Sequence, residues 1–268
     1  MAIGITFTNN KGGVAKTTSV VNTAAALAAV GLRILVVDAD PQGNATMHLG
    51  CREPALSSNK HIVSVIQGTP LLETLVPGNV EGVSVLASHS SLDQVASKFR
   101  GSKQQFMLFR QALGNGGMAT LPYDFVLFDT GPSKNEILAS AIDVSHGYII
   151  PLFAEIDSVV GLVELRQWLT TNSIDTVYNA QCLGLLITRF DKKNSTHGQM
   201  FSFLQETAKD VYIFNTQIPL SNTVQASAMH LTPLIGIRNG SSPAAVAYSN
   251  FVVELIEILK AKQMLVTT

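Results

Sequence analysis

The sequence predicts an α/β fold in which a mostly parallel, twisted sheet carries helices on both faces. Short apolar segments alternate with longer helical ones along most of the chain, as in strands joined by crossover helices. Several of these apolar segments are hydrophobic throughout, which is typical of strands buried on both faces. Charged residues make up only 14% of the chain, well below the roughly 25% usual for soluble domains, and this also favours a deeply buried sheet.

The first forty residues form the clearest strand–loop–helix–strand unit. Ile3, Ile5 and Phe7 alternate with small or polar residues and lead into a glycine-bearing loop. Residues 17–30 are rich in Ala and Val and contain no Pro or Gly, which predicts a closely packed helix that ends at Gly31. Residues 33–37 then predict a second strand, because they form a short apolar run.

The same alternation resumes in the second half of the chain. The expected elements are strand 125–128, strand 147–152, helix 158–170, strand 183–188, helix 198–209, short strand 211–214 and short strand 234–237. Ser242 and Pro243 suit the N-cap and first position of a last helix that runs to about residue 262.

The interval from residue 51 to residue 122 is less regular. It predicts helices and a short strand pair around residues 74–76 and 83–85. The chain contains no repeat, no low-complexity segment and no convincing linker. We therefore expect a single domain that spans residues 1–268.

The overall charge gives no sign that the whole surface attracts nucleic acid or anionic membranes. The formal net charge is −1, so no global basic field draws the protein onto nucleic acid or anionic membranes. Two distant cysteines, Cys51 and Cys182, indicate a reducing compartment without a built-in zinc or cluster site. The N-terminus lacks the pattern of a signal peptide, and no apolar run reaches about 18 residues. We expect a cytoplasmic protein.

Residues 11–18, with the sequence KGGVAKTT, predict a phosphate-binding loop. The loop lies between an expected buried strand and a helix N-terminus, where free backbone N–H groups and the helix dipole favour anions. Gly12 and Gly13 let the backbone approach phosphates closely. Lys16 can reach the β- and γ-phosphates, and Thr17 offers a hydroxyl to Mg²⁺. The alternative is a glycine-rich turn with two solvated lysines.

The strict P-loop pattern has glycine at the positions of Asn10 and Ala15. The octet instead resembles the deviant Walker A motif of the ParA/MinD family, usually KGGVGKTT, within the P-loop NTPase fold. The resemblance implies that ATP binds to Lys11, Gly12, Gly13, Val14, Ala15, Lys16, Thr17 and Thr18. It also implies that Lys11 reaches the ATP of a partner subunit, so that ATP drives a homodimer. The methyl group of Ala15 is the departure from the family: it is accommodated, slows hydrolysis or alters the loop.

Residues 38–44, DADPQGN, follow the second expected strand and resemble the family's switch I segment. Both carboxylates fall at the carboxyl edge of the sheet, where ligands bind in this architecture. The resemblance implies that Asp40 positions or activates the attacking water and that Asp38 supports the Mg²⁺ site. These residues, together with Lys11 and Lys16, form the predicted catalytic set. The alternative is that the two aspartates only cap a turn.

Residues 125–129 form an apolar strand that ends in Asp129, which is the Walker B pattern. Asp129 would hold Mg²⁺ through water, and with Thr17 and Asp38 it completes the predicted metal site. The family usually has Asp-Thr-Pro-Pro here, and Gly131 replaces the first proline, which loosens this segment. Asp124 lies at the far end of the strand and is interpreted as structural.

Two later segments predict contacts to the nucleotide base. By resemblance, Thr188, Arg189 and Pro219 enclose adenine, since they follow a strand and enter a loop. A surface ion pair is the alternative for Arg189. The resemblance to the family extends from Ile3 to about residue 260, with the order and spacing of the motifs intact.

Family members are slow ATPases that act as switches. The resemblance implies an ATP-bound dimer that binds nucleoid DNA or a membrane, and an adaptor of the ParB or McdB type that stimulates hydrolysis. The cargo is a plasmid, a chromosome or a protein organelle such as the carboxysome. Non-specific DNA binding predicts a nucleoid-associated protein and requires cations on one face. The candidates are Lys192, Lys193, Lys209, Arg238, Lys260 and Lys262.

The alternatives belong to other functional classes. A membrane-bound division-site ATPase of the MinD type needs a basic amphipathic tail, whereas residues 254–266 carry two Glu and only two Lys, which favours a helix packed on the sheet. A nitrogenase-reductase-like protein needs cluster-binding cysteines at a dimer interface. A small-molecule kinase or ligase needs a second substrate pocket. A structural protein without turnover follows if Ala15 disables hydrolysis.

Overall fold

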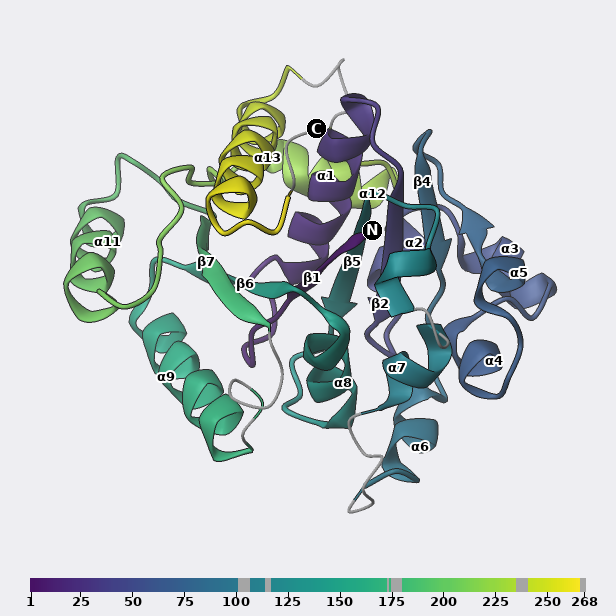
Figure 1. Cartoon of the computed structure of the whole chain (residues 1–268). Helices are drawn as coiled ribbons and strands as arrows, with labels where there is room; N and C mark the ends of the chain where they lie inside the picture. The colour runs from purple at the N-terminus through teal and green to yellow at the C-terminus, as the bar shows by residue number, and fades with distance from the viewer. Residues whose placement is uncertain (101–106, 114–116, 173, 175–179, 235–240, 266–268) are drawn as a thin grey trace.

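The computed structural model describes residues 1–100, 107–113, 117–172, 174, 180–234 and 241–265. Its seven strands form one sheet with the order β3-β4-β2-β5-β1-β6-β7, and each neighbouring pair is parallel except β3 and β4 (Figure 1). The strands are β1 (Ile3–Phe7), β2 (Ile34–Ala39), β3 (Val76–Pro77), β4 (Val83–Leu86), β5 (Phe125–Thr130), β6 (Gly147–Phe153) and β7 (Gln181–Thr188). This arrangement confirms the predicted α/β class.

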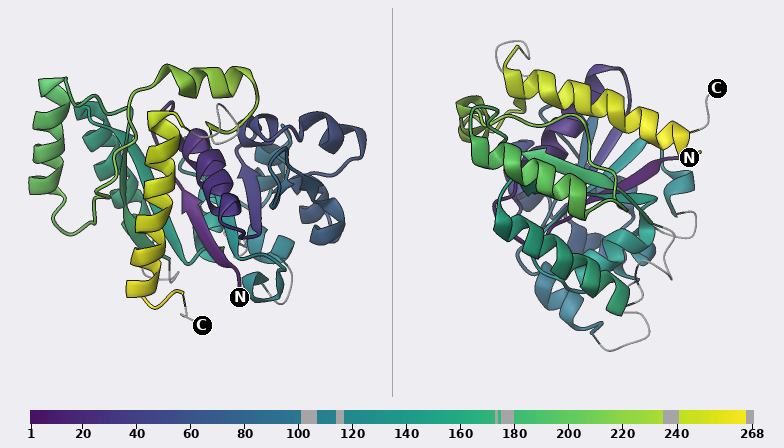
Figure 2. Two further views of the ribbon diagram at one scale, coloured as in Figure 1. Left: turned by 90° about the horizontal axis from the view of Figure 1, so that it is seen from above. Right: turned by 90° about the vertical axis from the view of Figure 1, so that its left-hand side faces the viewer.

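Helices cover both faces of the sheet, so the molecule has three layers (Figure 2). The helices α1 and α13 pack on one face, and α7, α8 and α9 are among those on the other. The described helices are α1 (Lys16–Ala29), α2 (Asn44–His48), α3 (Arg52–Ser57), α4 (Ile62–Ile66), α5 (Leu71–Thr74), α6 (Leu92–Ser97), α7 (Leu108–Leu113), the 3₁₀ helix η1 (Gly117–Thr120), α8 (Glu136–Val144), α9 (Ile156–Thr171), α11 (Ser195–Thr207), α12 (Asn222–Met229) and α13 (Pro243–Ala261).

The alternation of side chains along β2 shows how the two core layers form. Ile34 and Val36 join the apolar cluster beneath α1 and α13, whereas Leu35 and Val37 join the cluster on the opposite face. All four side chains are buried, because successive residues of a strand point to opposite faces. A continuous apolar run is therefore what a central strand of this sheet requires.

Two predicted helix ends are confirmed. Gly31 has a φ of 86°, a backbone conformation that glycine adopts without strain, directly after α1. Ser242 accepts a hydrogen bond from the backbone N–H of Ala245, and Pro243 opens α13 as expected. The apolar face of α13 packs against α1, which confirms that the last helix is part of the folded body.

The prediction of a strand at residues 211–214 is wrong. The segment pairs with β7 only around Leu185, as an isolated bridge to Ile213. The next two backbone N–H groups, of Asn215 and Thr216, donate to the Glu254 carboxylate on α13 at 2.6 and 2.9 Å. These donors are satisfied by a side chain, so no strand ladder continues. Of the strand expected at 234–237, residues 235–237 lie outside the described residues.

The irregular region is resolved into short elements. The expected strand pair is present as the antiparallel β3 and β4, although Thr74 ends helix α5 instead of starting a strand. Among the residues that the structure describes, no helix is long and apolar enough to cross a membrane.

Candidate nucleotide-binding site

Three central strands bring the predicted motifs to one edge of the sheet. Asp129 at the end of β5 is in register with Phe7 of β1 and with Asp38 of β2. Neighbouring strands lie about 4.8 Å apart, so the two carboxylates are close neighbours. The loop between β1 and α1 begins at the same edge. The structure therefore joins the phosphate loop, switch I and Walker B segments, as the sequence predicts.

The phosphate loop is braced by its own side chains. Asn9 is buried, donates to the Pro151 carbonyl at 2.8 Å and accepts from the N–H of Lys11 at 3.0 Å. The Lys16 Nζ donates to the Lys11 carbonyl at 3.0 Å, across the loop. A Cβ added at Gly12 or Gly13 would meet no heavy atom within 4 Å, so the space beside the loop is open.

Ala15 adopts a left-handed backbone, with φ of 67° and ψ of 30°, immediately before α1. This conformation costs an L-residue roughly 1–2 kcal/mol, and glycine adopts it freely. Val14 is buried, so the loop cannot shift easily to relieve this strain. The departure from the family pattern thus lies where the backbone itself favours glycine.

Lys16 lies among the predicted carboxylates. It is buried, and burial lowers the pKa of its ammonium group. The charges of Asp129 and Asp40 act in the opposite direction and favour the charged form. The Lys16 ammonium group therefore lies at the loop within reach of the charges of Asp129 and Asp40, which offset part of the cost of its burial.

Asp129 is fully buried, and only one of its oxygens has a partner. Oδ2 accepts a hydrogen bond from the Thr17 hydroxyl at 2.7 Å, whereas Oδ1 has no partner among the described residues. Burial, and next the charge of Asp38, raise the pKa of Asp129 well above its usual range. A buried carboxylate with an unsatisfied oxygen beside a hydroxyl has the chemistry of a Mg²⁺ site, so these residues fit the metal that a nucleotide brings.

Asp38, by contrast, is saturated by the protein. Its Oδ2 accepts from both the backbone N–H and the hydroxyl of Thr46 at 2.7 Å, and its Oδ1 accepts from the N–H of Asp40 at 3.2 Å. Burial raises the pKa of Asp38 to about 6, against the hydrogen bonds from Thr46, which lower it. Its predicted role at the metal stays a prediction.

Asp40 faces the segment that follows Asp129. A Cβ at Gly131 would lie 3.3 Å from Asp40 Oδ1, which is a tight contact. A cavity of about 200 Å³ lies beside this contact and is lined by residues of both segments and of nearby helices, among them Asp40, Gln42, Asp93, Ser133 and Asn135. The glycine that replaces the family's proline thus leaves room for the carboxylate predicted to position water.

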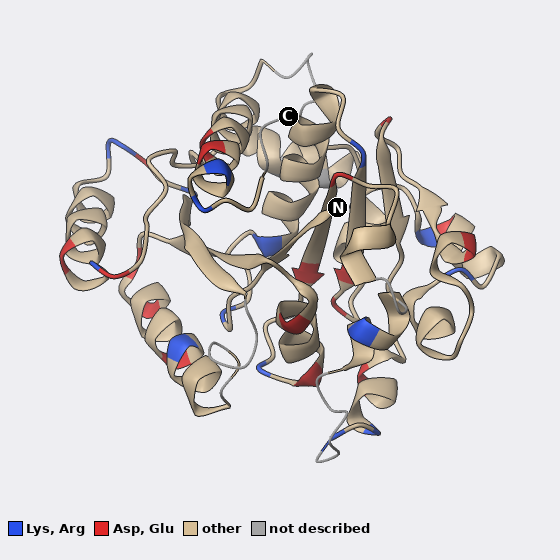
Figure 3. Cartoon of the chain, in the orientation of Figure 1, with Lys and Arg blue, Asp and Glu red and all other residues tan. Residues whose placement is uncertain are grey.

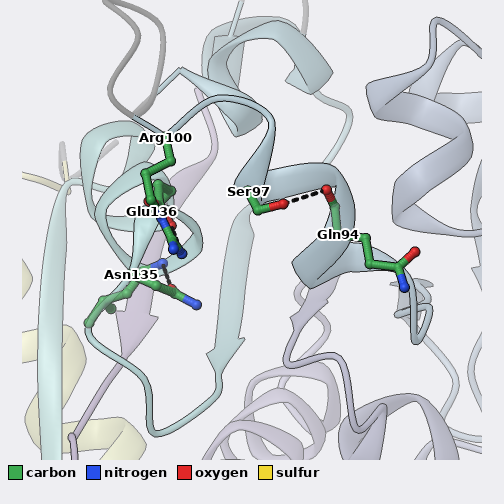
Figure 4. Close-up of polar contacts among 6 residues, drawn as sticks. Gln94, Ser97, Arg100, Asn135 and Glu136 are labelled. Carbon is green, nitrogen blue, oxygen red and sulfur yellow. Dashed lines mark hydrogen bonds and ion pairs between the residues drawn. The ribbon is translucent and has the colours of Figure 1, made fainter.

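The far end of this segment is anchored at the start of α8. Asn135 accepts from the N–H of Leu138 at 3.2 Å as the N-cap, and Glu136 pairs with Arg100 at 2.6 Å (Figure 4). Within α6, one turn apart, the Ser97 hydroxyl donates to the Gln94 carbonyl. Residues 131–134 therefore span the distance between two fixed points, Asp129 and the cap of α8.

Lys11 is held by its own subunit in this structure. Its Nζ lies 3.5 Å from Glu155 and 3.9 Å from Asp157, at the start of α9. Glu164, two turns further along α9, accepts from Asn10 at 2.8 Å. The predicted interface lysine thus has acidic partners within the monomer, and both acids are largely exposed.

The predicted base contacts come together in a pocket of about 250 Å³ next to the phosphate loop. Thr188, Arg189 and Pro219 all line it, with Gly13, Ala15 and Thr18. The Thr188 hydroxyl lies within hydrogen-bond distance of the Val14 carbonyl at 3.2 Å, so it also supports the loop. Arg189 has a φ of 52° and stacks over Phe153, with 4.7 Å between its guanidinium carbon and the ring centre. The contact of these residues with the base stays a prediction.

Sequence reasoning missed several residues of the site. Tyr248 of α13 lines the base pocket, is fully buried and is hydrogen bonded to Ser19 of α1 at 3.1 Å. Thr46 and Ser88 contact the switch I aspartates. An apolar helical spacing in α13 and isolated hydroxyl residues gave no signal for these contacts.

Both cysteine thiols are held protonated, since burial raises the pKa of Cys51 to about 12 and that of Cys182 to about 11.

Comparison with known proteins agrees with this geometry. A family model described as an AAA domain matches residues 2–182. The chain is 31% identical over 252 residues to the chromosome-partitioning ATPase Soj of Thermus thermophilus, covering 94% of each. The chain belongs to the ParA/MinD family of deviant Walker A ATPases. Another member, the chromosome partitioning protein ParA of Caulobacter vibrioides, is 30% identical over 204 residues, which are 76% of this chain and 73% of that one.

Solved structures of more distant proteins share the fold of this ParA/MinD-family chain. Apo McdA of Cyanothece has a TM-score of 0.82 at 18% identity, covering 96% of this chain and all of that one. Cobyrinic acid a,c-diamide synthase of Mycobacterium smegmatis, with an ATP analogue and magnesium bound, also has a TM-score of 0.82 at 23% identity, covering 100% of each chain. At these identities the similarity establishes the fold alone.

Proposed function

We propose that this chain hydrolyses ATP to ADP and phosphate with Mg²⁺ as cofactor, slowly and under the control of a partner. The observation that carries the proposal is the buried, unpartnered Oδ1 of Asp129, beside Thr17 and Lys16 at the phosphate loop. A divalent cation would satisfy that oxygen and, when bound, would neutralise charge on the phosphates. Membership of an ATPase family supports the same reaction.

The roles of the remaining residues follow from their positions. The N–H groups of residues 12–18 bind phosphate oxygens, and Lys16 neutralises their charge, as a loop before a helix allows. Asp40 orients the attacking water from the opposite wall, next to Gly131. The base lies between Arg189 and Pro219, whose pocket adjoins the loop. Asp38 holds the switch I segment in place through its hydrogen bonds, and so supports the metal site from the neighbouring strand.

We propose that ATP joins two copies of the chain. Lys11 lies half-buried at the start of the loop, and its side chain would turn from Glu155 to a phosphate of the other subunit. Phosphate contacts across the interface would be lost on hydrolysis, which makes the dimer a switch. An adaptor of the ParB or McdB type would stimulate hydrolysis and so set the lifetime of the dimer.

The cellular role that we propose is the segregation or positioning of a DNA or protein cargo, through non-specific binding of the ATP-bound dimer to nucleoid DNA in the cytoplasm. The relatives named as chromosome partitioning proteins support a DNA cargo. The described candidate cations are exposed and lie near both ends of α11 and at the end of α13. In Figure 3 the Lys and Arg positions are spread over many elements of the chain. Arg238 lies outside the described residues. Dimerisation would then be needed to assemble a continuous basic surface.

The test combines hydrolysis with retention on DNA. Phosphate release should require Mg²⁺, and DNA should retain the protein at low salt with ATP but not with ADP. Changing Lys192 and Lys193 to Ala together should weaken retention without slowing basal hydrolysis. Retention on liposomes in place of DNA would contradict the DNA proposal, and the absence of phosphate release would contradict the ATPase itself.

A further inference from the structure

Two hydroxyl residues outside the predicted motifs connect both switch I aspartates to the rest of the fold. Thr46 lies in the short helix α2, and Ser88 lies two residues after β4. Both are buried, with 3% and 7% of their surfaces exposed. Neither residue is in the phosphate loop or the base pocket, and both reach the site only through the switch I aspartates.

The hydrogen bonds of these residues form a continuous chain. The Thr46 hydroxyl donates to Asp38 Oδ2 at 2.7 Å and accepts from the N–H of Ser88 at 2.9 Å. The Ser88 hydroxyl donates to the Asp40 carbonyl at 2.5 Å. Because a hydroxyl has one proton to donate and lone pairs to accept, the Thr46 oxygen serves both neighbours at once. No apolar side chain of the same shape can replace it.

The far end of the chain is fixed by α4 (Ile62–Ile66). The N–H of Ile62 donates to the carbonyl of Ala87 at 2.8 Å. His89, the residue after Ser88, stacks on His61 at the start of α4, with 4.3 Å between ring centres. These two contacts connect the segment that carries Ser88 to α4, and through Ser88 and Thr46 they reach the switch I aspartates.

We propose that Thr46 and Ser88 are positioning residues of the ATPase, which hold Asp38 and Asp40 in place beside Asp129. The inference rests on the proposed function, since it concerns the same reaction. Neither residue lines the base pocket or the phosphate loop. Their loss should therefore slow the chemical step and weaken the response to Mg²⁺, while the affinity for ATP changes little.

The decisive variants are Thr46→Val and Thr46→Ser. Valine keeps the shape and removes the hydroxyl, whereas serine keeps the hydroxyl and removes a methyl group. We expect Thr46→Val to lower kcat by about 10- to 100-fold, as loss of a group that orients a metal-site ligand does, with KM for ATP within about twofold. The Mg²⁺ concentration for half-maximal rate should rise, and Thr46→Ser should restore most of the rate.

Thr74→Val is the matched control. Thr74 is also buried, and its hydroxyl donates to the Pro70 carbonyl at 3.0 Å in a short helix away from the site. It should lose comparable stability in a thermal melt but keep the wild-type rate. If Thr46→Val does not fold, Ser88→Ala is measured on the same readouts, with a smaller fall in kcat expected.

Three results are informative. A fall in kcat that serine rescues and Thr74→Val lacks supports the proposal. Wild-type kcat in folded Thr46→Val, or in Ser88→Ala where that variant replaces it, overturns the proposal, as does an equal fall in all the threonine variants. A wild-type protein without Mg²⁺-dependent phosphate release fails differently, because it overturns the proposed function before any variant is compared.

Discussion

The two aspartates that end β2 and β5 are neighbours in the sheet but differ in what surrounds them. Asp38 accepts three hydrogen bonds from the protein through its two oxygens. Asp129 accepts one, and its other oxygen is buried without a described partner. Burial raises the pKa of both carboxyls, so solvation alone does not distinguish them. The difference is that the protein completes one site and leaves the other for a ligand.

This difference assigns distinct tasks to two residues that the sequence presents alike. A saturated buried carboxylate fixes its own segment, and here it fixes switch I. An unsaturated one destabilises the fold until a cation or a donor arrives, and such strain is typical of functional sites. Substitutions that remove each charge but keep its shape should therefore have opposite effects on stability.

Asp129→Asn should have the largest effect on activity. Phosphate release should fall by about 100-fold, as loss of an outer-sphere metal partner does. The free energy of unfolding without nucleotide should rise at neutral pH. The folded-state pKa of Asp129 is above its unfolded value, so at a pH above both values ionisation costs stability, and the amide does not ionise. A lower melting temperature would contradict this account.

Asp38→Asn should destabilise the protein. Its single carbonyl oxygen cannot accept all the donors from Thr46 and Asp40, and the amide adds donors of its own. Because burial raises the pKa of Asp38 to about 6, asparagine also removes an ionisation cost at pH 7, and we expect the unsatisfied donors to outweigh that gain. Leaving a buried donor unsatisfied costs about 1–3 kcal/mol, which chemical denaturation at pH 7 would measure. If Asp38→Asn and Asp129→Asn shift the unfolding midpoint in the same direction, the contrast between the two strand ends is wrong.

Lys11, at the start of the loop, also has partners within its own chain. Its ion pairs with Glu155 and Asp157 should compete with the dimer contact. Exposed pairs are worth about 0.2–1 kcal/mol, so the combined changes Glu155→Gln and Asp157→Asn should tighten the ATP-dependent dimer by about two- to fivefold. Sedimentation with ATP and Mg²⁺ measures this. The combined changes Glu81→Gln and Glu206→Gln, at exposed acids without a described ion pair, control for net charge and should leave the dimer unchanged.

Ala15→Gly should raise the free energy of unfolding by up to about 1 kcal/mol. Glycine adopts the left-handed backbone without the cost that alanine has, but its more flexible unfolded chain offsets part of this gain. Gln263→Gly is the control. Gln263 has a φ of 58° just beyond α13, so glycine should stabilise it similarly with no change in ATP turnover. Thermal melts measure the stability of both variants, and phosphate release shows whether Ala15→Gly alone changes ATP turnover. A destabilised Ala15→Gly would show that the loop does not strain Ala15.

Asp124→Asn should have the smallest effect, confined to stability and to pH values at which Asp124 is ionised. Asp124 accepts from Arg33 through the backbone N–H at 2.8 Å and through the guanidinium, and the side-chain hydrogen bond is the largest cause that lowers the pKa of Asp124. The pair stabilises the fold above the unfolded value near 3.8 and loses this as the pH falls through the lowered folded value. The variant should cost about 0.2–1 kcal/mol at pH 7, a cost that disappears as the pH falls through the lowered folded value, with no change in ATPase rate.

The parts of the site that follow from sequence are those built from contiguous residues. The phosphate loop and the strand-ending aspartates carry their chemistry in local order, and a parallel sheet brings them to one edge. The hydroxyls of Thr46, Ser88 and Tyr248 meet their partners only through tertiary packing, so no local pattern marks them. The strand expected at residues 211–214 fails for a similar reason, because Glu254, distant in sequence, takes its neighbours' backbone donors.

The most direct test is the mass of the protein in solution with ATP and Mg²⁺, for the wild type and for Lys11→Ala. The account predicts twice the 28.7 kDa of one chain for the wild type with ATP and Mg²⁺, and a single chain without them. Lys11→Ala should remain a single chain in both conditions while still binding ATP. A wild type that stays a single chain, or a Lys11→Ala variant that dimerises equally well, would contradict the claim that two copies share the nucleotide.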